Sequence, residues 1–282
     1  MPFRFDEAPI VSRQNRRIVG LCKLTDRKAR EESGQFRLDG VKLLCEALRR
    51  GVTLTGVFLR VSDAAHVEER MRTLYGCTPE QLKCPVIPVE DGLFDKISTE
   101  NAPEGVISTA NYIDKRHKKY TINKDGLPEL PEGPVVLMES VRDPVNVGAV
   151  IRSAAALGVS CMILSQDCAD LYHPRTLRAA MGPLFSMPIL RVDDLCGAVR
   201  ILRERGRVVS AAALDDSAQR LGEVDMTGKN ATAVIGNEGH GLSEAVIAAC
   251  DRTVFIPMEA DTESLNAGVA ASLLMWEMRR RH

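Results

Sequence analysis

Residues 134–157 read PVVLMESVRDPVNVGAVIRSAAAL, and this stretch decides the fold that the sequence predicts. Its first apolar run, Val135–Met138, predicts a buried strand. A polar loop follows, and Asn146–Leu157 has the spacing of apolar residues that is typical of an amphipathic helix. A strand, a short loop and a helix form the repeating unit of an α/β fold with a mostly parallel sheet.

The same alternation extends in both directions along the chain. Towards the C-terminus we expect strands at 161–164, 208–213, 231–235 and 253–256, and helices near 175–181, 193–204 and 264–280. Towards the N-terminus, strands and helices alternate within residues 1–112. The polar segment 113–133 contains glycine and two prolines and has no hydrophobic period, which predicts a linker. The sequence therefore predicts a smaller α/β domain at 1–112, a linker at 113–133 and an α/β domain at 134–282.

The composition is that of a globular chain. Of its 282 residues, 45% are hydrophobic, and the net charge is −1, which excludes a mainly disordered state. No apolar run reaches the roughly 18 residues of a membrane span, and the N-terminus has no apolar signal core, so we expect a cytoplasmic protein without membrane contact. The eight cysteines and five histidines show no metal-ligand spacing, so we expect no metal site.

The near-zero net charge hides an asymmetry along the chain. Residues 1–120 hold 21 basic and 17 acidic side chains, whereas the remainder holds 16 and 21. Basic side chains that alternate with apolar ones near the N-terminus could contact phosphates, and the candidates for RNA binding are Arg16, Arg17, Lys23 and Arg37. A solvated helix face explains the same pattern equally well.

Three loops combine glycine with polar groups directly after an expected strand, where ligands bind in open α/β sheets. The first, residues 143–152, contains Asn146, which could cap a helix, and Arg152, which can face the same side. The second, residues 236–243, reads GNEGHGLS. Its glycine order is G-x-x-G-x-G, the reverse of the dinucleotide-binding order, which disfavours a nicotinamide-dependent oxidoreductase. The third, residues 256–266, reads IPMEADTESLN and leads into the last helix, with Ser264 as an N-cap candidate.

Taken in order, these loops resemble the motifs of the SpoU-type (TrmH-like) RNA ribose 2′-O-methyltransferases of the SPOUT superfamily. Asn146, Gly148 and Arg152 match N-x-G-x-x-x-R, and the second and third loops match G-N/S-E-G-x-G-L-S and I-P-M…S-L-N. The N-terminal part resembles the family's RNA substrate-binding domain. Two residues depart from the family pattern: Ala260 stands where glycine is common, and Gly268 where serine or alanine is usual.

The resemblance implies a C-terminal α/β trefoil-knot methyltransferase domain that forms a homodimer. It implies S-adenosylmethionine as the cofactor, without a metal, and methylation of a ribose 2′-hydroxyl in structured RNA. Ribosomal RNA, most of all 23S rRNA, is favoured over tRNA. The alternatives are a tRNA ribose 2′-O-methyltransferase and an inactive RNA-binding relative.

The resemblance also implies roles for individual residues. The catalytic candidates are Arg152, Asn146, Glu238, Ser264 and Asn266. The cofactor-binding candidates are Gly236, Asn237, Gly239, Ile256, Pro257, Met258, Ser264, Leu265 and Asn266. A guanidinium group keeps its proton at neutral pH, so we expect Arg152 to bind the adjacent phosphate and polarise the hydroxyl, and its action as a base stays open.

Overall fold

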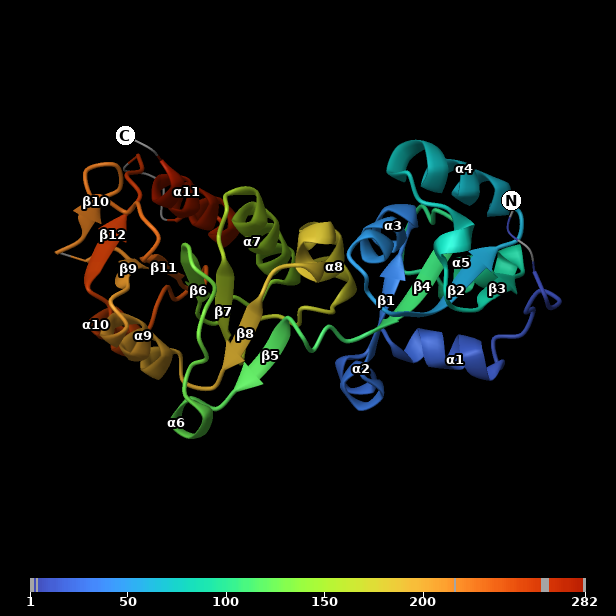
Figure 1. Ribbon diagram of the computed structural model, residues 1–282, viewed down its shortest axis with the longest axis horizontal. Helices are drawn as coiled ribbons and strands as arrows, with labels where there is room; N and C mark the ends of the chain where they lie inside the picture. Colours follow the sequence, from blue (N-terminus) through green and yellow to red (C-terminus); the bar gives the residue numbers. More distant parts are fainter. Residues whose placement is uncertain (1–2, 4, 216, 260–263, 281–282) are drawn as a thin grey trace. The chain divides into compact units, whose positions relative to one another are not determined.

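The computed structural model describes residues 3, 5–215, 217–259 and 264–280, and Figure 1 shows their helices and strands. The chain divides into two units. The N-terminal unit comprises residues 1–113 and 172–185, and the C-terminal unit comprises residues 114–171 and 186–282. The chain therefore passes between the units three times. No helix in the described ranges is long and apolar enough to cross a membrane.

The N-terminal unit is built on a four-stranded mixed sheet. Its strand order is β1 (Gln35–Asp39), β4 (Val106–Asn111), β2 (Leu54–Arg60) and β3 (Val86–Val89). Strand β4 is antiparallel to both β1 and β2, and β3 is parallel to β2. The helices are α1 (Arg16–Lys23), α2 (Arg27–Ser33), α3 (Val41–Arg49), α4 (Ala64–Tyr75), α5 (Asp91–Ile97) and the 3₁₀ turn η1 (Pro79–Gln81).

Helices cover both faces of this sheet. Phe58 of β2 belongs to a core with Ile18 of α1 and Phe94 of α5. The preceding residue, Val57, belongs to the opposite core with residues of α3 and α4, including Met71. Successive side chains of a strand point to opposite faces, so a single strand supplies both cores.

Residues 172–185 pack within the N-terminal unit, although they lie far along the sequence. They form α8 (Pro174–Ala180) and the 3₁₀ turn η2 (Gly182–Phe185). The ring of Tyr172 stacks on Tyr112 at 4.1 Å between centroids and lies 4.6 Å from Phe36. Its hydroxyl accepts a hydrogen bond from the Ile113 backbone at 2.8 Å. This differs from the predicted boundaries, which assign the segment to the C-terminal domain, because aromatic packing rather than sequence proximity decides where it lies.

The C-terminal unit is built on an eight-stranded sheet in which every pairing is parallel. Its strand order is β10 (Gln219–Arg220), β12 (Arg252–Phe255), β9 (Val208–Ala212), β11 (Ala231–Ile235), β6 (Val135–Met138), β7 (Cys161–Ser165), β8 (Ile189–Val192) and β5 (His117–Tyr120). Figure 1 shows α7 (Pro144–Ala156) and α11 (Ala267–Arg279) on one face of this sheet, and α6 (Ile122–Asp125), α9 (Leu195–Glu204) and α10 (Glu244–Ala249) on the other. The predicted parallel α/β arrangement is confirmed.

The segment predicted as a linker, residues 113–133, contributes to this sheet. Strand β5 pairs with β8, and α6 packs against α9. Ile122 and Leu127 are buried in the core of the C-terminal unit. The sequence does not reveal these elements because β5 is a short edge strand with exposed lysines, Lys118 and Lys119, and therefore lacks the apolar run of a central strand. The predicted strands at 135–138, 161–164 and 231–235 are confirmed, whereas β8 was not predicted.

Candidate active site

The three motif loops follow β6, β11 and β12. In an all-parallel sheet the carboxyl ends of the strands lie along one edge. Strand β11 is the direct neighbour of β6, and β12 is separated from β11 by β9. The topology therefore brings the three predicted loops to the same edge of the C-terminal unit, although 103 residues separate Arg152 from Phe255 along the chain.

Asn146 connects the three loops. The residue is buried, with a relative exposure of 7%. Its Nδ2 donates a hydrogen bond to Oε1 of Glu238 in the loop after β11. Its Oδ1 accepts one from Nδ2 of Asn266 at 2.8 Å, at the end of the loop after β12. Three of the predicted catalytic residues therefore form one hydrogen-bonded chain, and a hydrogen bond that involves a carboxylate is the stronger kind, worth about 1.5–3 kcal/mol.

The helix caps differ from those that the sequence predicts. Asp143, not Asn146, caps α7, because its carboxylate accepts from the Val145 backbone at 3.0 Å. Asn266, not Ser264, caps α11 through bonds from the Gly268 and Val269 backbones at 2.9 and 3.3 Å. Asn146 lies inside the first turn of its helix, where its amide is free to reach the other loops. Ser264 is exposed and precedes α11, which begins at Ala267 rather than at 264.

The loop after β11 is a tight turn that needs glycine. The backbones of Asn237 and Gly241 exchange two hydrogen bonds of 2.9 and 3.0 Å, and Gly241 has a φ of +66°. A Cβ on Gly236 would lie 2.3 Å from the carbonyl carbon of Gly241. Oδ1 of Asn237 accepts from the Gly239 backbone at 2.8 Å and the His240 backbone at 3.2 Å. Asn237 therefore shapes its own loop with the side chain that the sequence assigns to cofactor binding.

A polar cluster that the sequence did not predict holds this turn against the loop after β6. Nδ2 of Asn237 donates to the Ser140 carbonyl at 2.9 Å. Ser140 has a φ of +55° and donates its hydroxyl to Asp167 at 2.6 Å, and Ser165 donates to the same carboxylate at 2.6 Å. Burial acts to raise the pKa of Asp167, but the hydrogen bonds from Ser140, Ser165 and Arg142 outweigh it and lower the pKa below its ordinary value. Only the position of Ser140 and Arg142 between the end of β6 and the first motif loop could have indicated this cluster.

Arg152 is available to a ligand. It lies on α7, is exposed, and makes no hydrogen bond or ion pair with any residue that the structure describes. The helix that carries it is fixed against α11. Ser272 donates its hydroxyl to Ser153 at 2.9 Å. A Cβ on Gly268 would lie 3.3 Å from Cβ of Ala149, so the glycine that departs from the family pattern permits a close approach of the two helices.

The remaining predicted cofactor residues lie along the same edge. Gly239 is exposed in the turn after β11, Ile256, Pro257 and Met258 follow β12 directly, and Leu265 precedes the cap of α11. Ile256, Met258 and Leu265 are half-buried. Half-buried apolar side chains together with a glycine turn suit a purine and an amino-acid group. Residues 260–263 of the third loop, including Ala260, lie outside the described residues.

The predicted RNA-binding residues divide into two groups. Ile18 and Leu21 of α1 are buried, and Arg16, Arg17 and Lys23 are exposed on the same helix, with Arg17 paired to Glu7. These three side chains can reach a polyanion.

Arg37, the fourth candidate, cannot do so, and its prediction is wrong. Its side chain is fully buried, where it binds both oxygens of Asp39 at 2.6 and 2.9 Å and the carbonyl of Ile97 at 3.3 Å. The sequence is misleading here, because the positions of the neighbouring charged and apolar residues do not distinguish an arginine that faces the core from one that faces solvent.

Among the described residues, no group of three His, Cys, Asp or Glu side chains is arranged to hold a metal ion. All eight cysteines are free thiols.

Comparisons with known proteins match both parts of the chain. The family model described as "SpoU rRNA Methylase family" matches residues 133–276, and the one described as "MRM3-like substrate binding domain" matches residues 15–108. The chain is similar to the 23S rRNA (guanosine(2553)-2′-O)-methyltransferase RlmP of Bacillus subtilis, with 26% identity over 96% of this chain and 98% of that protein.

Two solved structures share the whole architecture. The AdoMet-bound rRNA methyltransferase of Sinorhizobium meliloti is 25% identical, with a TM-score of 0.75 over 96% of both chains. The SpoU methyltransferase AviRb of Streptomyces viridochromogenes, in complex with AdoMet, is 28% identical, with a TM-score of 0.74 over 94% of this chain and 97% of that one. The first family model spans just over half of the chain and includes all three motif loops. The chain therefore belongs to the SpoU rRNA methylase family, with an MRM3-like substrate-binding domain before its SpoU domain.

Proposed function

We propose that this protein methylates a ribose 2′-hydroxyl in structured RNA, with 23S rRNA as the favoured substrate. The observation that carries the proposal is the hydrogen-bonded chain of Asn146, Glu238 and Asn266, which joins three family motifs at one edge of the sheet. Asn146 lies on α7, the helix that also carries Arg152. Similarity to RlmP and to the AdoMet-bound methyltransferases supports the same reaction.

S-adenosylmethionine, when bound, supplies an electrophilic methyl group, so no metal is needed. The residues that would hold it are the Gly236–Gly239 turn, Ile256, Pro257 and Met258, and Leu265. The close backbone packing at Gly236 fits this role, because it keeps the turn in one conformation with exposed backbone groups beside it. A preformed turn loses little conformational entropy when a ligand binds.

Arg152 would act on the RNA. Its guanidinium group stays protonated at neutral pH, so it can bind the phosphate next to the target ribose and donate a hydrogen bond to the 2′-oxygen. The hydrogen bond stabilises the negative charge that develops on this oxygen as the oxygen bonds to the methyl group and its proton passes to solvent. Asn146, Glu238 and Asn266 would position the loops around it, and Ser264 lies on the approach to α11.

The N-terminal unit would dock the RNA. The exposed Arg16, Arg17 and Lys23 on α1 offer phosphate contacts, and recognition of the 2′-hydroxyl distinguishes RNA from DNA. We include a cytoplasmic location in this proposal, because the chain is similar to a bacterial rRNA methyltransferase.

We also propose that the protein is a homodimer with a trefoil knot in its SpoU domain. Val269, Leu273 and Trp276 of α11 are 49, 39 and 59% exposed, and Val145 of α7 is 38% exposed. Three apolar side chains at helical spacing favour burial against a second apolar face. A second copy of this chain supplies such a face by symmetry.

Transfer of a tritiated methyl group to total rRNA and total tRNA, followed by mapping of the modified ribose, tests the function. We expect label on a 2′-oxygen of 23S rRNA, whereas label on tRNA alone would favour the tRNA alternative. Arg152→Ala should lose transfer by about a hundredfold or more, the scale for removal of one transition-state donor, and keep its affinity for S-adenosylmethionine. Full transfer by this variant would overturn the assignment of Arg152, and wild-type protein that binds RNA without transfer would indicate an inactive relative.

A further inference from the structure

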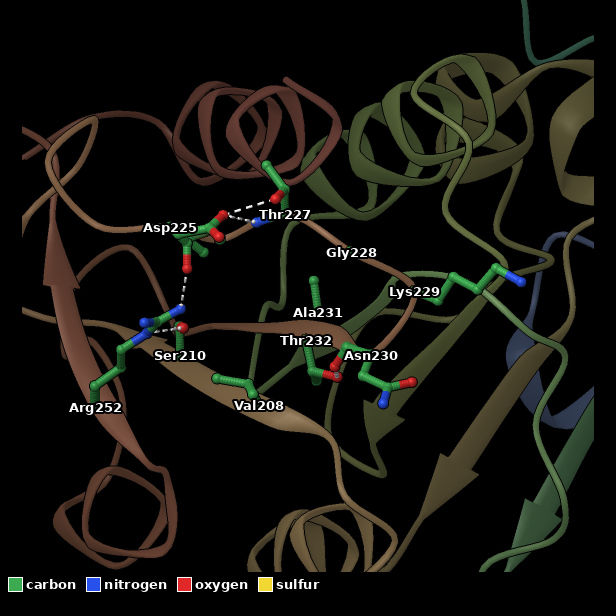
Figure 2. A pocket seen from close by; sticks show the side chains of 11 residues that line it. Val208, Ser210, Asp225, Thr227, Gly228, Lys229, Asn230, Ala231, Thr232 and Arg252 are labelled. Atoms are coloured by element: carbon green, nitrogen blue, oxygen red, sulfur yellow. Dashed lines mark hydrogen bonds between the residues drawn. The ribbon is translucent and has the colours of Figure 1, made fainter. Parts of the chain in front are cut away.

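Three neighbouring hollows on the C-terminal unit share the loop at residues 226–230, which leads into β11. Their volumes are 630, 610 and 190 Å³, and Lys229 lines all three. Figure 2 shows the largest, in which Arg252 reaches from β12 towards Asp225 and Lys229 extends from the far side, away from Arg252. None of the proposed active-site residues lines any of them.

These hollows lie at the amino ends of the strands. Val208, Ala231 and Arg252 are the first residues of β9, β11 and β12, and all three line the largest hollow. The methyl-transfer loops follow the carboxyl ends of the same sheet. Strands of four or five residues separate the two edges by about 13–17 Å. The hollows therefore lie at the opposite edge of the sheet from the proposed active site and are not an extension of it.

The lining of the hollows is positively charged on a unit whose sequence is acidic. Its charged side chains are six cations and three carboxylates, namely Arg205, Arg207, Lys229, Arg252, Arg279 and Arg280 against Glu129, Glu132 and Asp225. Residues 121–282 as a whole hold 16 basic and 21 acidic side chains. The 610 Å³ hollow has Lys229, Arg279 and Arg280 in its lining and no carboxylate.

Neutral acceptors hold three of these six cations, so the charges of these three are not cancelled. Arg205 donates to the carbonyl of Pro128 at 2.8 Å, and Arg207 donates to that of Gly133 at 3.0 Å. Arg252 donates to the hydroxyl of Ser210 at 2.9 Å and to the carbonyl of Asp225 at 2.6 Å.

The other three cations differ in how strongly they are neutralised. Arg279 is exposed beside Gly158 and makes no ion pair with the described residues. Lys229 pairs with Glu132 at 3.1 Å, but both side chains are about four-fifths exposed, at 79 and 84%. Such an exposed pair contributes little and exchanges readily for another anion. Arg280 pairs with Glu277 at 3.1 Å.

We propose that Lys229, Arg252, Arg279 and Arg280, here called the basic edge, bind the phosphodiester backbone of the RNA substrate away from the methylated ribose. The inference rests on the proposed function, because it takes the same RNA as the ligand. Cations spread over several shallow hollows match a chain of regularly spaced phosphates better than one small anion, which a single enclosed pocket would suit. Contacts of this kind position RNA without reading its sequence.

The test compares Lys229→Ala, Arg279→Ala and Arg279→Lys with Arg200→Ala as the matched control. Arg200 is an exposed arginine on α9 that lines none of the hollows. For each protein we would measure methyl transfer to rRNA against RNA concentration, RNA binding against salt, and S-adenosylmethionine affinity by calorimetry.

We expect each alanine variant of the basic edge to raise KM for RNA about threefold to fivefold, the scale of one exposed ion pair, with kcat and cofactor affinity unchanged. The slope of log affinity against log salt should become shallower by about 0.7–1 for each cation removed. Arg279→Lys should restore most of the binding, and Arg200→Ala should behave as wild type.

Unchanged KM and salt slope in both alanine variants would overturn the proposal, and so would an Arg279→Lys variant as defective as Arg279→Ala, which would indicate a packing role. If Arg200→Ala had an equal effect, the basic edge would contribute only non-specific charge, and the proposal would also be overturned. Failure of the proposed function appears differently, as wild-type protein that transfers no methyl group to RNA.

Discussion

Replacement of Asn146 by alanine tests whether one buried amide holds the three motif loops together. The variant loses two hydrogen bonds, one to the Glu238 carboxylate and one from Asn266 Nδ2 at 2.8 Å. The first is worth about 1.5–3 kcal/mol and the second about 0.5–1.5 kcal/mol. Glu238 and Asn266 are partly exposed and regain water, so we expect the lower end, a loss of about 2 kcal/mol in the free energy of unfolding.

Denaturant unfolding measures this loss, and calorimetry with S-adenosylmethionine measures its consequence for the site. When the loops are no longer joined, part of the binding free energy is spent on ordering them. We therefore expect cofactor affinity to fall about tenfold, which corresponds to about 1.4 kcal/mol. Ser153→Ala is the matched control, because it removes a hydrogen bond between α7 and α11 without changing a residue of the three loops. It should leave cofactor affinity unchanged.

A double-mutant cycle of Asn146→Ala with Glu238→Ala then isolates the contact. We expect a coupling energy of at least about 1 kcal/mol, since the two side chains are direct partners. Asn146→Asp adds a second carboxylate beside Glu238. Like charges raise the pKa of such a pair, so its defect should shrink as the pH falls and one carboxyl group is protonated. Additive single mutants, or a stable Asn146→Ala protein with full cofactor affinity, would refute the reasoning.

Three further changes probe the turn, the exposed helix face and the polar cluster. Gly236→Ala places a Cβ 2.3 Å from the Gly241 backbone, which cannot move aside, so the free energy of unfolding should fall by about 1–3 kcal/mol and cofactor binding should weaken. Gly239→Ala, whose nearest neighbour is 3.5 Å away, is the control for the stability measurement alone, because Gly239 belongs to the same cofactor-binding turn. Trp276→Glu puts a charge on the apolar face of α11 and should convert a dimer to monomers in sedimentation experiments, and a monomeric wild type would contradict the proposed assembly. The lowered pKa of Asp167 means that its ionised form stabilises the fold fully above the ordinary pKa of 3.8, and that this stability is lost as the pH falls through the lower folded-state pKa. Asp167→Asn should therefore be less stable than wild type at neutral pH and converge with it under acid, as measured by thermal unfolding across pH.

The sequence predicts the motif loops well because each signal is local. A buried strand such as β11 is a run of mostly apolar residues, and the glycine and asparagine that follow it are typical of a turn at the end of a strand. Signals that depend on a distant partner are lost. Strand β5 gains its place only by pairing with β8, some seventy residues later, and Tyr172 gains its place only by stacking on Tyr112.

By itself, the sequence determined the parallel α/β arrangement of the C-terminal half and the three loops of its site, since apolar periodicity and glycine placement act within a few residues. Only the tertiary structure decided that Asn146 joins these loops rather than capping its helix, that Arg37 is buried against Asp39, and that the cations around Lys229 gather at the opposite edge of the sheet. These outcomes depend on which residues from remote parts of the chain become neighbours. Burial and hydrogen-bond partners are properties of that neighbourhood, and spacing along the chain does not encode them.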